Sequence, residues 1–237
     1  MIISAQGLDF RTLNAQIQSA ADVTVCDCLG QRFIGTAQED GMITVYGTPG
    51  NALGAYLNGA AIHVFGNGQD AVGDTMNGGE IVIYGNVGDA LGYAMRGGCI
   101  YVRNSAGYRA GIHMKEYQDK KPVLVIGGSA GSFLGEYLAG GIIIVLGLEA
   151  DGLPVGDFIG TGIHGGRIFV RTEEPLLNLP EQVTASVASA GELEEITPFV
   201  VRFAALFDAG VAQIMQSRFY VLKPNAKNPY KQLYAAN

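Results

Sequence analysis

A repeat of 19 residues, marked by glycine, constrains the fold of this chain more than any other feature. Three consecutive units share this spacing, and their central segments read GAAIHVFG, GGEIVIYG and GGCIYVRN. The recurring positions are Gly54, Gly73 and Gly92, then Gly59, Gly78 and Gly97, then Gly66, Gly85 and Asn104. A fixed period of this length predicts stacked units rather than a conventional globular core.

Each unit carries one short strand in which apolar residues alternate. Because strand side chains alternate between two faces, Ile81 and Ile83 point to the same side. Stacking the strands about 4.8 Å apart then builds two continuous apolar ladders. The predicted inward pairs are Ile43 and Val45, Ile62 and Val64, Ile81 and Ile83, Ile100 and Val102, Val123 and Val125, Ile143 and Val145, and Ile168 and Val170. A strand near residues 23–26 is expected to begin the stack.

A third ladder lies on another wall of the turn. Its members are Leu57, Met76, Met95, Met114, Leu138 and Ile163. Three inward ladders from different points of one turn describe a prism. The sequence therefore predicts an all-β fold, a single-stranded parallel β-helix of about eight coils. We expect it to be right-handed, because parallel crossovers have that hand.

Glycine is expected to form the corners of this prism. A short coil turns sharply at fixed points, often with a positive φ that glycine adopts without steric cost. One corner carries patterns such as GDALG at 88–92, and another carries Gly-Gly pairs such as 97–98. Because the chain has no GxxxxGK[ST] motif, we assign the glycines to corners rather than to a phosphate site. Short polar residues that can bond neighbouring backbone follow the strands at Thr48, Asn67, Asn86 and Ser105.

The repeat divides the chain into three parts. Residues 21–171 are predicted to form the β-helix. Residues 1–20 are expected to cap its start, with an amphipathic helix within 9–18. Residues 172–237 are predicted to be a linker and a C-terminal helical tail.

Two helix-start signals lie in the tail. Ser189 and Glu192 have the spacing of a capping box, and Thr197 before Pro198 is a second start signal. Helices are therefore expected within 190–196, 198–208 and 211–218, followed by a strand at 219–224.

Composition excludes several classes of protein. The net charge of −7 argues against a nucleic-acid partner or an anionic membrane partner. No apolar run is long enough to span a bilayer and no signal peptide opens the chain, so we expect a cytoplasmic protein. Cys26 and Cys28, expected on one strand face, and the distant Cys99 are interpreted as small strand residues rather than metal ligands.

Charge is distributed unevenly along the chain. No Lys or Arg lies between Phe33 and Met95. Acidic residues there are Glu39, Asp40, Asp70, Asp74, Glu80 and Asp89, and the basic residues that follow are Arg96, Arg103, Arg109, Lys115, Lys120 and Lys121. Two interpretations stay open: a solvated surface with ion pairs between coils, or an oriented docking surface for partner subunits.

Asn51, Asp70 and Asp89 occupy equivalent positions in three successive coils. Carboxylates about 4.8 Å apart repel each other unless they accept backbone hydrogen bonds or hold a cation. We favour turn caps over a cation site, because aspartate commonly bonds nearby backbone in turns.

No catalytic constellation is evident. His63, His113 and His164 fall in different parts of the coil, and no HExxH motif or nucleophile elbow is present. We therefore assign no catalytic, cofactor-binding or metal-binding residue.

Two other features point to partners. The outward strand positions have a mixed character that is typical of a partly covered surface: Thr44, His63, Val82, Tyr101 and Leu124. Insertions at 112–121 and near 148–155 interrupt the repeat, and they are either partner contacts or tolerated loops.

The repeats GxxxG…GGxIxVxG over about residues 20–171 resemble the GXGXG domain of the glutamate synthase large subunit. The ending FYVLKPNAKNPYKQLY resembles the FxKVxPxxYKxxL close of that subunit. The resemblance implies a right-handed β-helix that has no active site of its own. In that family the domain packs between an amidotransferase domain and a flavin-bearing synthase barrel.

The resemblance implies an accessory subunit of a split glutamate synthase, which makes glutamate from glutamine and 2-oxoglutarate. No activity is expected of the chain alone, and no cofactor is expected on it. FMN and iron–sulfur clusters would lie on the amidotransferase and synthase partners, because this chain has no N-terminal Cys nucleophile, barrel or cysteine cluster.

Other assignments remain open. The C subunit of formylmethanofuran dehydrogenase shares the repeat, and glycine spacing alone does not separate the two families. A free-standing scaffold or binding module is a third possibility, and a homo-oligomer is compatible with each of them.

The ladder model predicts the effect of a charge at Ile81. Ile81→Asp is expected to lower the free energy of unfolding by several kcal/mol, because the carboxylate is buried among aliphatic side chains. Urea unfolding followed by circular dichroism measures this loss. A variant as stable as the original chain would mean that the ladder faces solvent.

Overall fold

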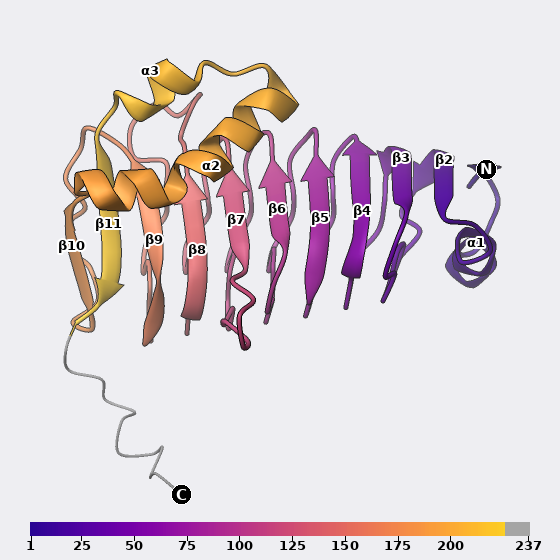
Figure 1. Ribbon diagram of the computed structural model, residues 1–237, viewed down its shortest axis with the longest axis horizontal. Helices are drawn as coiled ribbons and strands as arrows, with labels where there is room; N and C mark the ends of the chain where they lie inside the picture. Colours follow the sequence, from indigo (N-terminus) through magenta and orange to yellow (C-terminus); the bar gives the residue numbers. More distant parts are fainter. Residues whose placement is uncertain (226–237) are drawn as a thin grey trace, which may run out of the picture.

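The computed structural model, which describes residues 1–225, is an elongated prism built on one sheet of 11 strands (Figure 1). The first nine strands follow one another both along the chain and across the sheet, and each is parallel to the next. In Figure 1 the strands run upward at the front while the chain returns behind them and advances from right to left. The fold is a right-handed parallel β-helix of about eight coils, as predicted.

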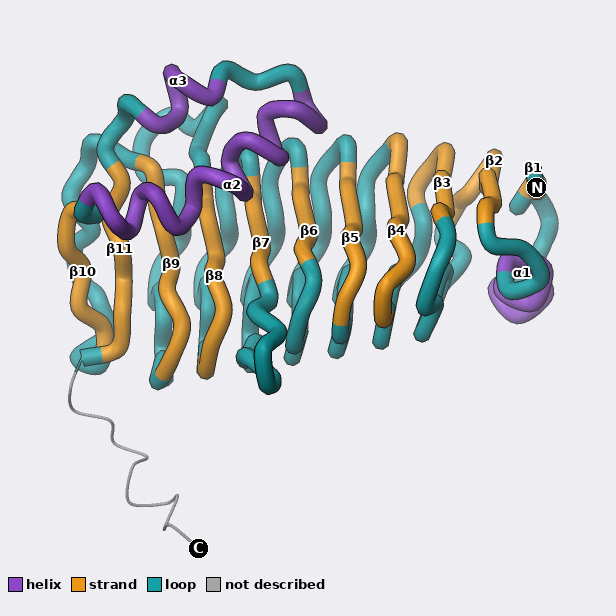
Figure 2. The backbone as a smooth tube through the Cα atoms, in the orientation of Figure 1, coloured by secondary structure: helices purple, strands orange, loops and turns teal. Residues whose placement is uncertain are grey.

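Short strands and longer turns alternate throughout (Figure 2). The strands are β1 (Ile2–Ser4), β2 (Asp22–Leu29), β3 (Met42–Thr48), β4 (Asn58–Phe65), β5 (Gly78–Ile83), β6 (Cys99–Val102), β7 (Val123–Ile126), β8 (Ala139–Val145), β9 (Gly165–Arg171), β10 (Val183–Val187) and β11 (Phe219–Pro224). The helices are α1 (Phe10–Ile17), α2 (Ala190–Phe207) and α3 (Val211–Met215). Within residues 1–225, no helix is both long and apolar enough to cross a lipid bilayer.

The inward ladders are in register over the central coils. Ile62 pairs with Ile81, which pairs with Ile100, and all three side chains are fully buried. The predicted third ladder is confirmed, since each of its members from Leu57 to Ile163 is buried in the same core. A further wall was not predicted and comprises Leu53, Val72, Leu91, Ala110, Leu134 and Ile159.

The predicted register of β7 is wrong by one residue. Leu124 pairs with Ile100 and lies in the central core, whereas Val123 and Val125 belong to a second cluster on the outward face. The segment VLVI is aliphatic at every position, so it has no alternation that distinguishes the two faces. A slip of one residue therefore reverses the assignment of every side chain in the strand.

The corners use glycine for two different reasons. Gly92 and Gly98 have positive φ values of 65° and 81°, as expected for this residue. The φ angle of Gly97 is not in the left-handed region, but a Cβ at this position would lie 2.6 Å from the carbonyl oxygen of Asn77 in the preceding coil. Left-handed backbone is not confined to glycine, because Ala90 and its equivalents also have it: Ala52, Ala71, Arg109, Phe133 and Phe158.

Helix α1 closes the N-terminal end of the stack. Strand β1 adds one more strand to the sheet at this end, and this strand was not predicted from the sequence. Asp9 caps α1 by accepting hydrogen bonds from the backbone N–H groups of Arg11 and Thr12. Leu13 and Ile17 of this helix are buried in the solenoid core. Figure 1 places α1 at the same end of the prism as β2 and β3.

The C-terminal part returns to the sheet and covers part of it. β11 pairs antiparallel with β9, and β10, which was predicted as linker, pairs antiparallel with β11. Helix α2 begins at the predicted capping box of Ser189 and Glu192. It then runs through Pro198 without a break, so the predicted pair of helices is wrong.

Packing explains the continuity of α2. Ile196 and Val200, on either side of Pro198, are fully buried against the outward face of the sheet, together with Phe203. This burial offsets the hydrogen bond that proline removes. The motif NPYKQLY at 228–234, one basis of the family resemblance, lies outside the described residues.

The two insertions leave the prism at opposite ends of its strands. Residues 112–121 precede β7 and contain a small antiparallel bridge between Tyr117 and Lys120. The loop near 148–155 follows β8. They therefore do not share one face.

Close approach between coils generates a prediction at Gly97. Gly97→Ala is expected to lower the free energy of unfolding by about 2 kcal/mol, because the added Cβ meets the Asn77 carbonyl. Gly191→Ala is the matched control, since a Cβ there has no atom within 4 Å. Thermal unfolding of both variants tests whether the close contact at Gly97 limits the size of this residue. A Gly97→Ala variant that melts at the same temperature as the original chain would show that it does not.

Candidate functional site

The three histidines lie at different positions of the coil repeat. His63 is on the outward face of β4, where its Nε2 atom is 3.8 Å from a carboxylate oxygen of Glu80. His113 has left-handed backbone at a corner and stacks on Tyr137 with ring centroids 5.1 Å apart. His164 lies beside the carbonyl of Gly162 near the start of β9. The histidines are therefore not brought together, as their different places in the repeat predicted.

The ladder of Asn51, Asp70 and Asp89 caps turns. Oδ1 of Asp70 accepts a hydrogen bond of 2.9 Å from the backbone N–H of Asp89, and Oδ1 of Asp89 accepts one of 2.8 Å from that of Tyr108. Asn51 accepts the corresponding bond from the backbone of Asp70. Within residues 1–225, no group of three or more His, Cys, Asp or Glu side chains is arranged to hold a metal ion.

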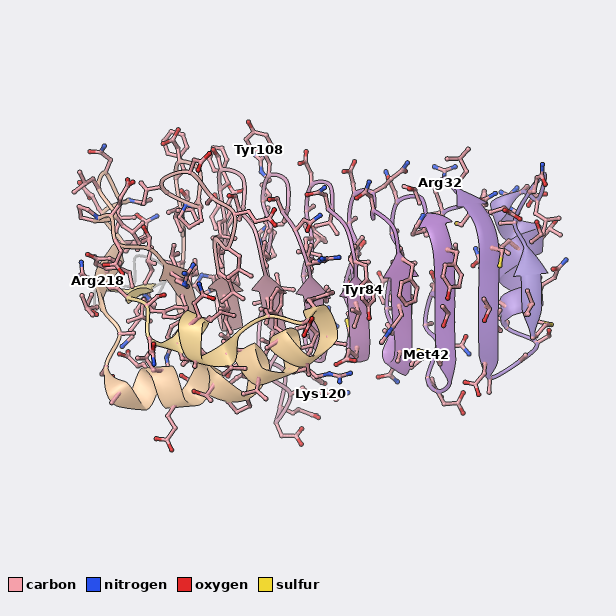
Figure 3. The ribbon with its side chains drawn as sticks, turned by 90° about the horizontal axis from the view of Figure 1, so that it is seen from above. Arg32, Met42, Tyr84, Tyr108, Lys120 and Arg218 are labelled. Atoms are coloured by element: carbon pink, nitrogen blue, oxygen red, sulfur yellow. The ribbon has the colours of Figure 1, made fainter. Side chains whose placement is uncertain are left out.

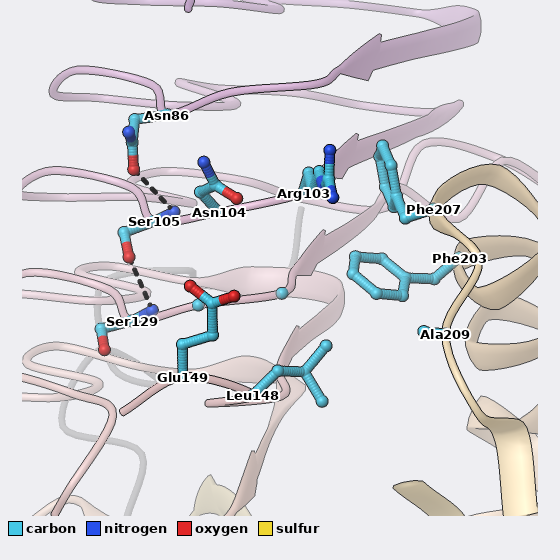
Figure 4. Close-up of a pocket in the computed structure, with 12 residues that line it drawn as sticks. Asn86, Arg103, Asn104, Ser105, Ser129, Leu148, Glu149, Phe203, Phe207 and Ala209 are labelled. Atoms are coloured by element: carbon cyan, nitrogen blue, oxygen red, sulfur yellow. Dashed lines mark hydrogen bonds between the residues drawn. The ribbon is translucent and has the colours of Figure 1, made fainter. Parts of the chain in front are cut away.

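A second polar ladder runs along the adjacent corner. The side chains of Asn67, Asn86 and Ser105 each accept a backbone hydrogen bond from the next coil. Figure 4 shows the last two of these bonds, which end at the backbone of Ser129. The prediction that short polar residues after the strands bond neighbouring backbone is confirmed at these three positions.

A pocket of about 390 Å³ lies between this ladder and the end of α2 (Figure 4). One wall is formed by Phe203 and Phe207, and the opposite side carries Asn104. Arg103 and Glu149 also line it, and neither forms an ion pair within the described chain. The pocket has groups that can bind polar side chains, but it does not pair a nucleophile with a base.

The cysteines do not form a ligand set. A bulge at Asp27, where φ is 57°, turns Cys28 into the core while Cys26 stays partly exposed, so the predicted common face is wrong. Burial raises the pKa of Cys28 to about 11 and also raises that of Cys99. Both thiols therefore remain protonated and are poor nucleophiles at neutral pH.

The C-terminal half of the outward sheet face is covered by the chain itself. Helices α2 and α3 pack on strands β5 to β9 and β11, and the side chains of Val82 and Tyr101 are buried beneath them. The mixed outward positions of these strands were interpreted as a partner-covered surface. Here the cover is intramolecular, and the outward residue of β7 is Val125 rather than Leu124.

The N-terminal half of the same face carries an exposed aromatic strip, formed by Tyr46, Phe65 and Tyr84. The ring centroids of Tyr46 and Phe65 are 5.0 Å apart, and those of Phe65 and Tyr84 are 4.4 Å apart. Tyr46 is 48% exposed and Phe65 is 41% exposed. The sequence carries a signal that we missed, because an aromatic residue precedes a glycine at the 19-residue spacing in each of these coils.

An ionic clasp joins the covered and uncovered halves. Arg202 of α2 donates two hydrogen bonds, of 3.0 and 2.6 Å, to the carboxylate of Glu80 at the start of β5. His63 and Arg202 lower the pKa of Glu80 to about 2, although burial opposes them. The clasp holds one side of α2 against the sheet.

Other ion pairs account for part of the uneven charge. Glu195 of α2 pairs with both Lys121 and Arg167 of the solenoid. Arg109 pairs with Glu136 of the next coil at 2.9 Å. Two residues of the basic stretch, Arg109 and Lys121, thus form ion pairs with the next coil and with α2, whereas the stretch between Phe33 and Met95 contains acidic residues but no Lys or Arg.

The clasp predicts a dependence of stability on pH. Glu80→Gln is expected to lower the free energy of unfolding by about 1 kcal/mol at pH 7, since Arg202 is partly exposed. The folded-state pKa is depressed, so this contribution is present above pH 4.5 and is lost as the pH falls towards 2. Urea unfolding of both proteins at pH 7, 5 and 3.5 measures the difference.

Glu149→Gln serves as the matched control, because this exposed carboxylate has no ion pair in the described chain. A difference between Glu80→Gln and the original chain that stays constant from pH 7 to 3.5 would contradict the assignment of the clasp.

Comparisons with known proteins agree with this architecture. A family model described as the GXGXG motif matches residues 11–226. The protein MJ1350 of Methanocaldococcus jannaschii, described as uncharacterized, is 43% identical over 250 residues, which cover 99% of this chain and 96% of that protein.

A solved structure has the same fold. It is a chain in the crystal structure of the formyltransferase/hydrolase complex FhcABCD from Methylorubrum extorquens with methylofuran, with a TM-score of 0.65 and 21% identity. The match covers 85% of this chain and 73% of that chain. The family match extends over nearly the whole described chain, and the protein belongs to the GXGXG family.

Proposed function

We propose that the chain is a non-catalytic structural subunit of a split glutamate synthase. In this role it holds an amidotransferase subunit and an FMN-bearing synthase subunit together in the cytoplasm. Membership of the GXGXG family carries the proposal, because the same repeats resemble the β-helical domain of the glutamate synthase large subunit. The partners would convert glutamine and 2-oxoglutarate to glutamate and would hold the FMN and iron–sulfur clusters.

The distribution of side chains supports a structural role. The inward aliphatic residues of each coil are buried in the core, and carboxylates such as Asp70 and Asp89 accept hydrogen bonds from the backbone of the next coil. Three surface features of the described chain are available to contact other molecules: the aromatic strip, the pocket beside Arg103 and the two insertions. A stiff body with such surfaces is suited to positioning other subunits.

The fold likeness to a chain of the FhcABCD complex supports a second candidate. The protein would then be the C-type subunit of a formylmethanofuran dehydrogenase-like complex. At 21% identity the likeness extends to the fold alone, so it does not outweigh the resemblance to glutamate synthase. Both candidates share the feature that a β-helix assembles with catalytic subunits.

Purification of the tagged chain from cells that express it naturally tests the proposal. We expect an amidotransferase and a flavin absorbance spectrum to co-purify, with glutamine-dependent formation of glutamate from 2-oxoglutarate. Deleting the gene is expected to reduce that activity at least tenfold in extracts, because the partners lose their relative positions. The Ile81→Asp chain is the control, since a misfolded solenoid should recover neither partner.

The outcomes separate the candidates. A molybdenum or tungsten enzyme in the purified complex supports the formylmethanofuran dehydrogenase-like role. A chain that purifies alone as a monodisperse species rejects both and leaves the free-standing scaffold.

A further inference from the structure

We propose that the pocket beside Arg103 binds a free α-amino acid, whose carboxylate pairs with Arg103 and whose ammonium group pairs with Glu149. The proposal goes beyond the structural role given above and does not depend on it, because every residue that it uses belongs to this chain. It assigns a ligand to a chain whose other polar side chains mainly bond neighbouring coils.

The pocket holds one positive and one negative side chain that are not joined to each other. Arg103 and Glu149 both line it, and no ion pair within residues 1–225 includes either of them. Figure 4 shows Arg103 on the side of Phe207, and Glu149 on the side of the hydrogen bond between Ser105 and Ser129. A ligand that carries both charges can therefore lie between them and form a charge-assisted hydrogen bond with each.

Asn104 departs from the repeat at this pocket. The same column is glycine in the coils on either side, at Gly85 and Gly128, and backbone hydrogen bonds link both of them to Asn104. A Cβ at Gly85 would lie 2.3 Å from Oδ1 of Asn67, so stacking of the coils favours glycine in this column. The side-chain amide of Asn104 has no hydrogen-bond partner within residues 1–225. Stacking does not explain this residue, whereas a polar ligand does, because an amide can both donate and accept hydrogen bonds.

Arg103 is a second departure. The three preceding coils carry the aromatic strip in this column, and the next coil carries Gly127. Tyr84, the last ring of the strip, lies close to the end of the helical cover (Figure 3) and meets Phe207 at 5.2 Å. Because Gly127 has no side chain, space remains between Arg103 and α2, and Phe203 fills only part of it. The pocket thus opens at the coil where the aromatic column ends.

Elements outside the repeat complete the pocket. The insertion near 148–155 supplies Leu148 and Glu149, and α2 supplies Phe203 and Phe207. Phe203 is fully buried, so its ring is held in place by the sheet. These rings form an apolar wall for the carbon atoms of a ligand, while Asn104 and the two charged side chains contact its polar groups.

Charge and size together define the class of ligand. A simple anion would be repelled by Glu149, and a simple cation would be repelled by Arg103. A neutral ligand would remove water from both charged groups without replacing the lost interactions. The volume of about 390 Å³ is near the lower limit for small-molecule pockets. A free α-amino acid combines this small size with one carboxylate and one ammonium group.

Calorimetric titration of the full chain with each proteinogenic L-amino acid tests the proposal. We expect at least one of them to bind with a Kd of about 1 mM or lower. The tightest binder is then compared with its analogue that lacks the amino group and its analogue that lacks the carboxylate; for L-glutamine these are glutaramate and 4-aminobutanamide. Each analogue is expected to bind about tenfold more weakly, because one charged side chain of the pocket is left unpaired.

Variants of the two charged residues separate binding from a structural role. Glu149→Gln is expected to bind the amino acid and the analogue without the amino group equally, since the group that distinguishes them is gone. Arg103→Gln is expected to lose the distinction between the amino acid and the analogue without the carboxylate. The controls are Asp151→Asn in the same insertion and Lys115→Gln in the other, which are exposed, do not line the pocket and should bind as the original chain does.

Three results would overturn the proposal. The first is that no amino acid binds more tightly than about 10 mM. The second is that both analogues bind as tightly as the amino acid, and the third is that Arg103→Gln and Glu149→Gln weaken all three compounds by the same factor. That last result would mean that the two residues only maintain the fold around the pocket.

The outcome is independent of the proposed function, because the titration needs no partner subunit. If an amino acid binds but no amidotransferase or flavin synthase co-purifies, the binding site stands and the proposed function fails. If both partners co-purify but no amino acid binds to the chain, the binding site is wrong and the proposed function stands.

Discussion

Stacking of one coil on the next at strand spacing is the constraint on which the rest of the structure depends. It brings Ile62, Ile81 and Ile100 into register and buries them completely, at a gain of about 1.5–3 kcal/mol for each side chain. The same spacing leaves no room for a Cβ at positions such as Gly97, where the backbone of adjacent coils nearly touches. Each 19-residue unit thus meets two requirements: aliphatic side chains at the inward positions, and glycine where the backbones of adjacent coils come into contact.

Because of this stacking, the residues inside the prism and those on its outward face are under different constraints. Inward positions must be aliphatic in every coil, whereas outward positions are free to differ along the stack. The chain uses this freedom by covering β5 to β9 and β11 with its own helices α2 and α3 and leaving aromatic rings exposed on β3 and β4. The clasp of Arg202 on Glu80 stands at the boundary between these regions. One sheet therefore carries an internal packing surface and an open surface side by side.

Periodic features could be predicted from the sequence, and features that depend on a single local choice could not. The ladders, the polar corner residues and the capping box of α2 follow from spacing and residue type. The register of β7 could not be predicted, because VLVI is aliphatic on both faces, and the path of α2 through Pro198 depends on burial that only the folded sheet supplies. The strip at Tyr46, Phe65 and Tyr84 was visible in the repeat, but its exposure depends on where α2 ends.

The geometry of a solenoid also bears on how the chain would act in a complex. Each coil contacts mainly its neighbours, so the distance between two surfaces is set by the number of coils between them. The polar ladder from Asn67 to Ser129 adds a line of side-chain hydrogen bonds along one edge and opposes bending there. The aromatic strip and the pocket beside Arg103 stand at fixed positions on this body. Two molecules bound at separate points on the prism would consequently keep a constant orientation relative to each other, which is the property that transfer between separate catalytic subunits requires.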